Sequence, residues 1–122
     1  MIPLDEARGM LDELISELPE AIFTRLNGGV LLLPDVRLSP EARSEDLYIL
    51  GEYSISYAMG RTVVIYYGSI LRTHGVLTPE RLRAVLREVL HHELTHHLES
   101  MAGERDLEID DALKMAWYKM RR

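Results

Sequence analysis

One segment, from Thr78 to Gly103, limits what this chain can fold into more than any other. Thr78, Pro79 and Glu80 supply a typical helix start, with a hydroxyl cap, a proline in the first turn and an early acidic residue. Gly103 is placed to end the helix. We therefore expect one long helix from Pro79 to about Ala102. Its apolar stripe consists of Leu82, Val85, Leu86 and Val89.

The same helix carries a histidine cluster, because four of the chain's five histidines fall between His91 and His97. His92 and His96 are four residues apart, so their imidazoles point the same way and can converge on one metal ion. Glu93 is rotated by about 100° around the axis, beside the metal, where it can deprotonate a metal-bound water. Extending the apolar stripe forward puts this HExxH motif on the core-facing side of the helix. The pattern predicts a metal site with Glu93 as the catalytic residue; the alternative is a pair of core histidines without metal.

The other two histidines of the cluster occupy different faces of the helix. His91 falls on the polar face with Arg87 and Glu88, so we expect it in solvent. His97 shares a sector with apolar residues, which indicates a hydrogen-bonded core histidine that supports the metal ligands from behind. Because the four imidazoles are spread around the axis, a metal buffer that uses all of them is disfavoured.

The composition narrows the possible ligands and partners. The 122 residues suit one packed domain, which we expect to span residues 1–122. The absence of cysteine excludes disulfides and thiolate metal sites, so imidazole and carboxylate must hold any transition metal. The net charge of −6 argues against nucleic acid as a partner, because phosphate binding needs a basic face. Residues 1–18 do not resemble a secretory signal and no run approaches the ~20 apolar residues of a membrane span, so we expect a cytoplasmic protein without membrane contact.

Outside the long helix, helix and strand signals follow each other along the chain. The predicted helices cover residues 4–18, 19–26, 68–74 and 110–120. The predicted strands are residues 30–33 and a hairpin within residues 47–67 that turns near Gly60, with residues 62–67 as the strongest strand. Residues 34–46 are predicted to form a loop, of a length that is often functional.

Residues 18–106 resemble the small, single-domain zincin-like metallopeptidases of minigluzincin type. Members of that family share an apolar strand after the first helices, a strand resembling residues 62–67, a short segment resembling residues 68–71, and HExxHH, here residues 92–97. The resemblance implies an α+β fold in which a small mixed β-sheet packs against N-terminal helices and the long HExxH helix, with a C-terminal helix. It also implies Zn²⁺ as cofactor, a peptide or protein substrate, and peptide-bond hydrolysis by a metal-bound water that Glu93 activates.

The resemblance also suggests where a substrate binds. In zincins a β-strand beside the active-site helix pairs through its exposed edge with an extended peptide. By analogy, the candidate substrate-binding edge strand consists of Thr62, Val63, Val64, Ile65, Tyr66 and Tyr67. An ordinary core strand is the alternative for the same residues.

The third metal ligand is the point at which the chain departs from the family. Relatives commonly follow HExxHH with one residue, a glycine and, about three residues later, an acidic ligand. Here Glu99 occupies the glycine position and Gly103 comes four residues later, which displaces the acidic element by about one helical turn, ~6 Å along the axis. Asp106 is the first choice for the third ligand, with Glu99 and Glu104 as alternatives. The departure leaves open a second function, a catalytically weak or inactive zincin-fold protein that acts as a protein-interaction module.

Overall fold

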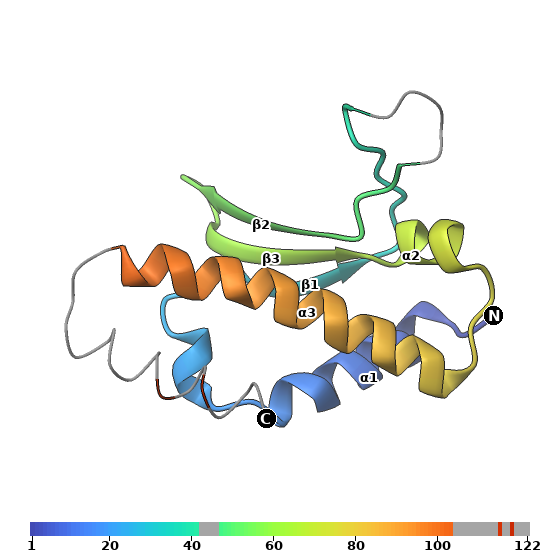
Figure 1. The fold of residues 1–122 in the computed structure, drawn as a ribbon, viewed down its shortest axis with the longest axis horizontal. Coiled ribbons are helices and arrows are strands. Elements are labelled where there is room, and N and C mark those ends of the chain that lie inside the picture. The colour runs from blue at the N-terminus through green and yellow to red at the C-terminus, as the bar shows by residue number, and fades with distance from the viewer. Residues whose placement is uncertain (42–46, 104–114, 116–117, 119–122) are drawn as a thin grey trace.

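The computed structural model describes residues 1–41, 47–103, 115 and 118. In this part of the chain the helices are α1 (Leu4–Ser16), the 3-10 helix η1 (Glu20–Phe23), α2 (Tyr67–His74) and α3 (Pro79–Ala102). The strands are β1 (Gly29–Leu33), β2 (Gly51–Ser56) and β3 (Gly60–Tyr66). Figure 1 shows the strands as one sheet, with α3 lying along it and α1 beside α3. A small mixed sheet beside helices confirms the expected α+β fold.

The sheet has the strand order β1-β3-β2, with β3 in the centre. β1 runs parallel to β3, from Gly29 opposite Thr62 to Leu33 opposite Tyr66. β2 and β3 form an antiparallel hairpin, as the sequence predicts. Gly60 turns the hairpin with a φ of 70°, in the left-handed region where a side chain would be strained.

The prediction that residues 62–67 form an edge strand is wrong. β3 is paired with a neighbour on each side and so has no free edge, and Tyr67 is the first residue of α2. The reason is burial: Val63 and Ile65 are completely buried, and an apolar run rich in β-branched residues suits the centre of a sheet. Among the described residues, the edges of the sheet are β1 and β2.

The core lies between the sheet and the helices. The apolar stripe of α3 is buried as expected, at Leu82, Val85, Leu86 and Val89. α3 touches both β2 and β3, and α1 packs against α3. This packing holds the HExxH turn of α3 beside the β2 edge of the sheet.

Both ends of α3 agree with the sequence prediction. The Thr78 side chain accepts a hydrogen bond from the Arg81 N–H at 3.3 Å, and Pro79 lies in the first turn. At the other end the Gly103 N–H donates to the Glu99 carbonyl at 3.3 Å. None of the helices in the described part of the chain is long and apolar enough to cross a membrane.

The terminal helices differ from their predictions. α1 ends at Ser16, two residues before the predicted end. The helix predicted over residues 19–26 is only the short η1, because Thr24 leaves the helical region with a ψ of 128°. The helix predicted over residues 110–120 lies outside the described residues except for Met115 and Tyr118, which are helical and exposed.

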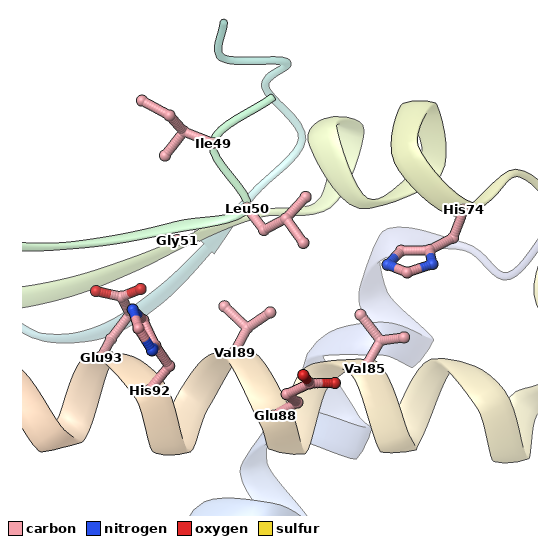
Figure 2. Close-up of a pocket in the computed structure, with 9 residues that line it drawn as sticks. All are labelled: Ile49, Leu50, Gly51, His74, Val85, Glu88, Val89, His92 and Glu93. Carbon is pink, nitrogen blue, oxygen red and sulfur yellow. The ribbon is translucent and has the colours of Figure 1, made fainter. Parts of the chain in front are cut away.

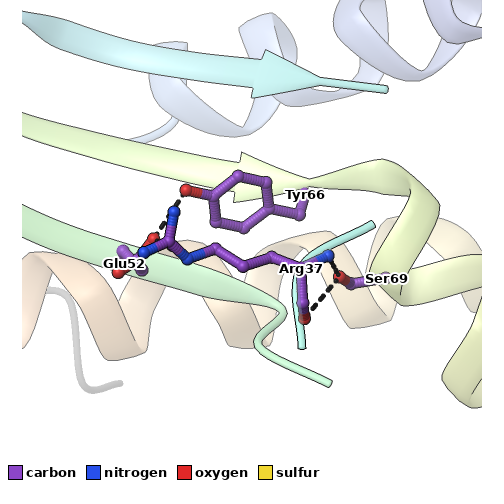
Figure 3. A network of polar contacts seen from close by, with 4 residues as sticks. All are labelled: Arg37, Glu52, Tyr66 and Ser69. Carbon is purple, nitrogen blue, oxygen red and sulfur yellow. Dashed lines mark hydrogen bonds and ion pairs between the residues drawn. The ribbon is translucent and has the colours of Figure 1, made fainter. Parts of the chain in front are cut away.

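Residues 34–50, which join β1 to β2, are called the arm below. Its described stems pair with each other, for example through the Ile49 N–H and the Arg37 carbonyl at 2.8 Å. Arg37 also anchors the arm to the sheet (Figure 3): its Nε lies 2.9 Å from Glu52 Oε1, and its N–H donates to Ser69 Oγ at 2.8 Å. The Tyr66 hydroxyl donates to the same Glu52 oxygen at 2.6 Å. The base of the arm is thereby tied to β2, β3 and α2.

Candidate metal centre

His92 and His96 lie one turn apart on α3, with ring centroids 4.9 Å apart and perpendicular ring planes. Both residues are exposed, so the expectation that the whole motif faces the core is wrong for them. It holds for Glu93, which is only 5% exposed. β2 covers α3 at Glu93. Both imidazoles lie about 60–100° away from Glu93 around the helix axis, on the same side, and there they are exposed to solvent. A metal ion and a substrate can therefore reach the pair.

The Glu93 carboxylate lies beneath the edge strand β2, in contact with its backbone. It accepts a hydrogen bond from the Tyr53 N–H. Burial raises the pKa of Glu93, and the nearby Glu52 carboxylate raises it further, whereas His92, His96 and the Tyr53 N–H act in the opposite direction. A carboxyl group with a raised pKa holds a proton more readily than an ordinary carboxylate, which suits it to both accepting and donating one.

Gly51 makes this close approach possible. A Cβ at this position would lie 2.7 Å from Val89 Cγ1, 3.1 Å from Glu93 Cγ and 3.3 Å from Glu93 Oε2. Any larger residue would separate β2 from α3 or displace the Glu93 side chain. The sequence prediction missed this role, because nothing in the pattern around Gly51 marks it as a contact to the helix.

Two hollows meet at Glu93, between α3 and β2. The first, shown in Figure 2, has a volume of about 460 Å³ and is largely apolar. It is lined by Ile49, Leu50, Gly51, His74, Val85, Glu88, Val89, His92 and Glu93. The second has a volume of about 580 Å³ and is lined by Glu52, Tyr53, Ile55, Glu93, His96, Glu99 and Ser100. We refer to the two hollows together as the cleft; Glu93 lines both, so the HExxH turn lies between them.

His97 is fully buried, as the sequence predicts for a hydrogen-bonded core histidine. Its Nε2 lies 2.8 Å from the Thr24 carbonyl and its Nδ1 lies 2.8 Å from the Tyr53 hydroxyl. Arg61 donates to the same hydroxyl at 3.0 Å and also to Ser100 Oγ. Since a carbonyl can only accept, Nε2 carries the proton, and in the neutral ring Nδ1 accepts from Tyr53. The Tyr53 hydroxyl therefore donates its proton to a hydrogen bond with His97.

Sequence reasoning left Tyr53 and Arg61 out of the site. The alternation of side chains along the strands could have found them. Tyr53 lies on the same face of β2 as Gly51. In the sheet Tyr53 pairs with Val63, and Arg61, two residues before Val63, lies on the same face. His91, expected in solvent, is partly buried. Burial lowers its pKa, and Arg87 lowers it further.

The third ligand remains a prediction. Within the described part of the chain, no three His, Asp or Glu side chains are grouped so that they could hold one metal ion. Glu99 is exposed, with Oε2 at 3.9 Å from His96 Nδ1, so it lies beside one ligand of the pair. Glu104 and Asp106 lie outside the described residues.

The comparisons with known proteins agree with this geometry. The family model described as zincin-like metallopeptidase matches residues 46–115, more than half of the chain. This chain belongs to the zincin-like metallopeptidase family. The matched region contains β2, β3, α2 and α3, and β2, α2 and α3 supply residues that line the cleft.

A solved structure with the same fold is also similar. It is a conserved hypothetical protein from Thermus thermophilus, with a TM-score of 0.68 and 31% identity. The match covers 84% of this chain and 99% of the other. A search among curated proteins gave no match.

Proposed function

We propose that this zincin-like protein is a zinc-dependent peptidase. The observation that carries the proposal is the arrangement on α3: a buried Glu93 beside two exposed imidazoles one turn apart, at the centre of a cleft bordered by an edge strand. Membership of the zincin-like metallopeptidase family supports the same reaction class.

The donor set fits zinc. Imidazole and carboxylate are ordinary zinc ligands, and the chain has no cysteine to favour a thiolate site. We propose that His92 and His96 hold Zn²⁺ together with a carboxylate, Asp106 first and Glu99 or Glu104 otherwise. When bound, zinc supplies a Lewis acid that lowers the pKa of water and polarises a carbonyl group.

Glu93 is the proton carrier in this proposal. Its raised pKa and its position beside the imidazoles suit it to take a proton from the attacking water and to give it to the leaving amine. The Tyr53 N–H holds one part of the carboxylate, which leaves the remaining lone pairs for the proton. Tyr53 itself does not supply its hydroxyl proton to the cleft, because His97 accepts it.

The structure supports β2 as the strand that binds the peptide. The Leu50 carbonyl accepts from the Tyr66 N–H, so by antiparallel alternation the main chain of Gly51, Tyr53 and Ile55 points away from β3. Those outward groups lie beside Glu93. The Tyr53 N–H is used by the Glu93 carboxylate, and the other outward groups form an edge on which an extended peptide can pair. We propose this edge for the main chain of the substrate, in place of the β3 residues that the sequence suggested.

The apolar hollow would determine most of the preference for particular substrate side chains. Its walls are Val85 and Val89 of α3 opposite Ile49 and Leu50 at the base of the arm. A volume of about 460 Å³ accommodates a bulky side chain. We therefore propose that the enzyme prefers peptides with a large apolar residue beside the bond that is cleaved.

The experiment is a metal analysis combined with a peptide-cleavage assay. The purified protein should carry about one zinc per chain, and His92→Ala should lose it. Glu93→Gln should keep the zinc and lose hydrolysis, because the amide cannot accept the proton. His91→Ala is the matched control, since it removes an imidazole from the same helix outside the proposed ligand set. A protein that fails to bind added Zn²⁺ would refute the proposal.

A second candidate function, a protein-interaction module, is favoured by the exposed tip of the hairpin. Ile55 and Met59 are 63% and 50% exposed and Tyr57 is fully exposed, beside the open edge of β2. A stable partner captured equally by wild type and Glu93→Gln, together with no cleavage of any peptide, would support this candidate over a peptidase.

A further inference from the structure

The edge strand β2 is held against α3 at two separate points of Tyr53. Its backbone N–H donates to the Glu93 carboxylate, and its side-chain hydroxyl reaches the fully buried His97. Glu93 and His97 are four residues apart on α3 and so lie on the same side of the helix, one turn apart. A single residue of the strand thus contacts two successive turns of the active-site helix.

The His97 end of this connection is fixed by its own partners. Nε2 donates to the Thr24 carbonyl at 2.8 Å, at the end of η1, which determines the ring orientation and leaves Nδ1 to accept from Tyr53. Arg61 of β3 donates to the Tyr53 hydroxyl at 3.0 Å. The hydroxyl is therefore held from both α3 and β3, and it has little freedom to move.

The Glu93 end lacks such support from the sheet. The Tyr53 N–H points away from β3, so it is not paired in the sheet and its position depends on how firmly β2 lies on α3. At Gly51 the strand has no side chain that could grip the helix. The Tyr53 side chain is a contact of β2 with α3 that can keep the N–H in line with the Glu93 carboxylate.

We propose that His97 is a positioning residue which, through Tyr53, fixes the orientation of the Glu93 carboxylate. The described contacts of His97 are with the Thr24 carbonyl and the Tyr53 side chain. It acts by holding the tyrosine hydroxyl, and the tyrosine N–H then holds the acid. This inference rests on the proposed peptidase function for its catalytic meaning, but the mechanical connection can be measured without zinc or substrate.

The test is amide hydrogen exchange at residue 53 in the metal-free protein, for wild type and Tyr53→Phe. Removing the hydroxyl leaves the ring and the backbone N–H in place, so only the anchor to His97 and Arg61 is lost. We expect the residue 53 amide to exchange about tenfold faster, the effect of weakening one hydrogen bond. His97→Gln, which can still donate to Thr24, is the second variant and should act in the same direction.

Tyr67→Phe is the matched control. Tyr67 is a buried tyrosine whose hydroxyl also makes a hydrogen bond inside the protein, to the Ile2 carbonyl, but Tyr67 lines neither hollow of the cleft. Its loss should leave the exchange of residue 53 unchanged. An unchanged rate in Tyr53→Phe, or an equal acceleration in Tyr67→Phe, would overturn the proposal, because the effect would then be absent or merely global.

The zinc-loaded protein supplies the catalytic readout. Tyr53→Phe should lower kcat by about tenfold with little change in KM, since a misplaced proton acceptor affects the chemical step and not peptide binding. A rise in KM with unchanged kcat would contradict the positioning role. If the wild type cleaves no peptide, the proposed function fails, while the exchange experiment still decides whether His97 positions Glu93.

Discussion

Gly51→Ala tests whether β2 and α3 are packed as closely as the cleft requires. The new methyl group would meet Val89 Cγ1 at 2.7 Å and Glu93 Cγ at 3.1 Å. Val89 cannot rotate away easily, because a valine in a helix is largely restricted to one rotamer. The strand must then move from the helix, and overpacking of this kind costs about 1–3 kcal/mol. For a chain of this size we expect the melting temperature to fall by about 5–15 °C.

Gly9→Ala is the matched control for the same chemical change. Gly9 lies on the exposed side of α1, and a Cβ there would meet nothing within 4 Å. Alanine in a helix is favoured over glycine by about 0.5–1 kcal/mol, so this variant should melt higher than wild type. The two glycine substitutions are therefore predicted to have opposite signs.

Thermal and denaturant unfolding of the metal-free proteins provides the assay, since a bound metal would add its own stabilisation. Val89→Ala in the Gly51→Ala background removes the methyl group that overlaps the new alanine. The double variant should therefore lose less stability than the sum of the losses of the two single variants. A Gly51→Ala protein as stable as wild type would refute the close packing of β2 on α3. The peptidase rate should fall with the stability, because the Tyr53 N–H moves with the strand.

Two further predictions concern Glu93 and the apolar hollow. The pKa of Glu93 is raised in the folded protein, so ionisation of this carboxyl group opposes folding. The protonated group therefore contributes to the free energy of unfolding at low pH, and this contribution is lost as the pH rises through the raised pKa. Metal-free Glu93→Gln should therefore be more stable than wild type at about pH 7, and the difference should shrink toward about pH 4; denaturant titrations at both pH values would show a constant difference if the reasoning is wrong. Val85→Ala enlarges the apolar hollow at its wall, so kcat/KM should rise for peptides with a larger apolar side chain relative to peptides with a smaller one. The ratio of the two kcat/KM values should change by about 10-fold or more for each extra methylene group that the hollow accommodates. If a peptide library shows the same preference for wild type and Val85→Ala, the hollow does not determine which peptides are cleaved.

The parts of the fold that local signals determine could be predicted. α3 begins where Thr78 and Pro79 indicate, because capping groups act within a few residues. It ends at Ala102, directly before Gly103 as expected, although Gly103 keeps a right-handed φ of −70°. The hairpin and its turn at Gly60 follow from the same kind of short-range pattern. Prediction failed where the outcome depended on distant partners. The order of strands in the sheet is set by β1, which pairs with β3 from far away in the sequence, so the strongest strand became central when an edge was expected.

The candidate site shows the same division. Helical spacing correctly placed Glu93 and His97 on buried sides of the helix, but it placed His92 and His96 there as well. It did not predict how far His92 and His96 extend into solvent, because that depends on where β2 stops covering the helix. Tyr53 and Arg61 join His97 only because the hairpin packs on α3, and no sequence spacing connects these three residues.

The parallel pairing of β1 with β3 makes the assembly of the sheet a non-local event. β2, β3, α2 and α3 follow one another along the chain, so their contacts close short loops, whereas β1 reaches β3 only across the arm and the hairpin. We expect the hairpin and α3 to associate early in folding and β1 to dock late. Until it does, β3 presents an apolar, unpaired edge to other strands. A newly made or partly unfolded copy of this chain is thus most exposed to aggregation on the side of the sheet opposite the cleft.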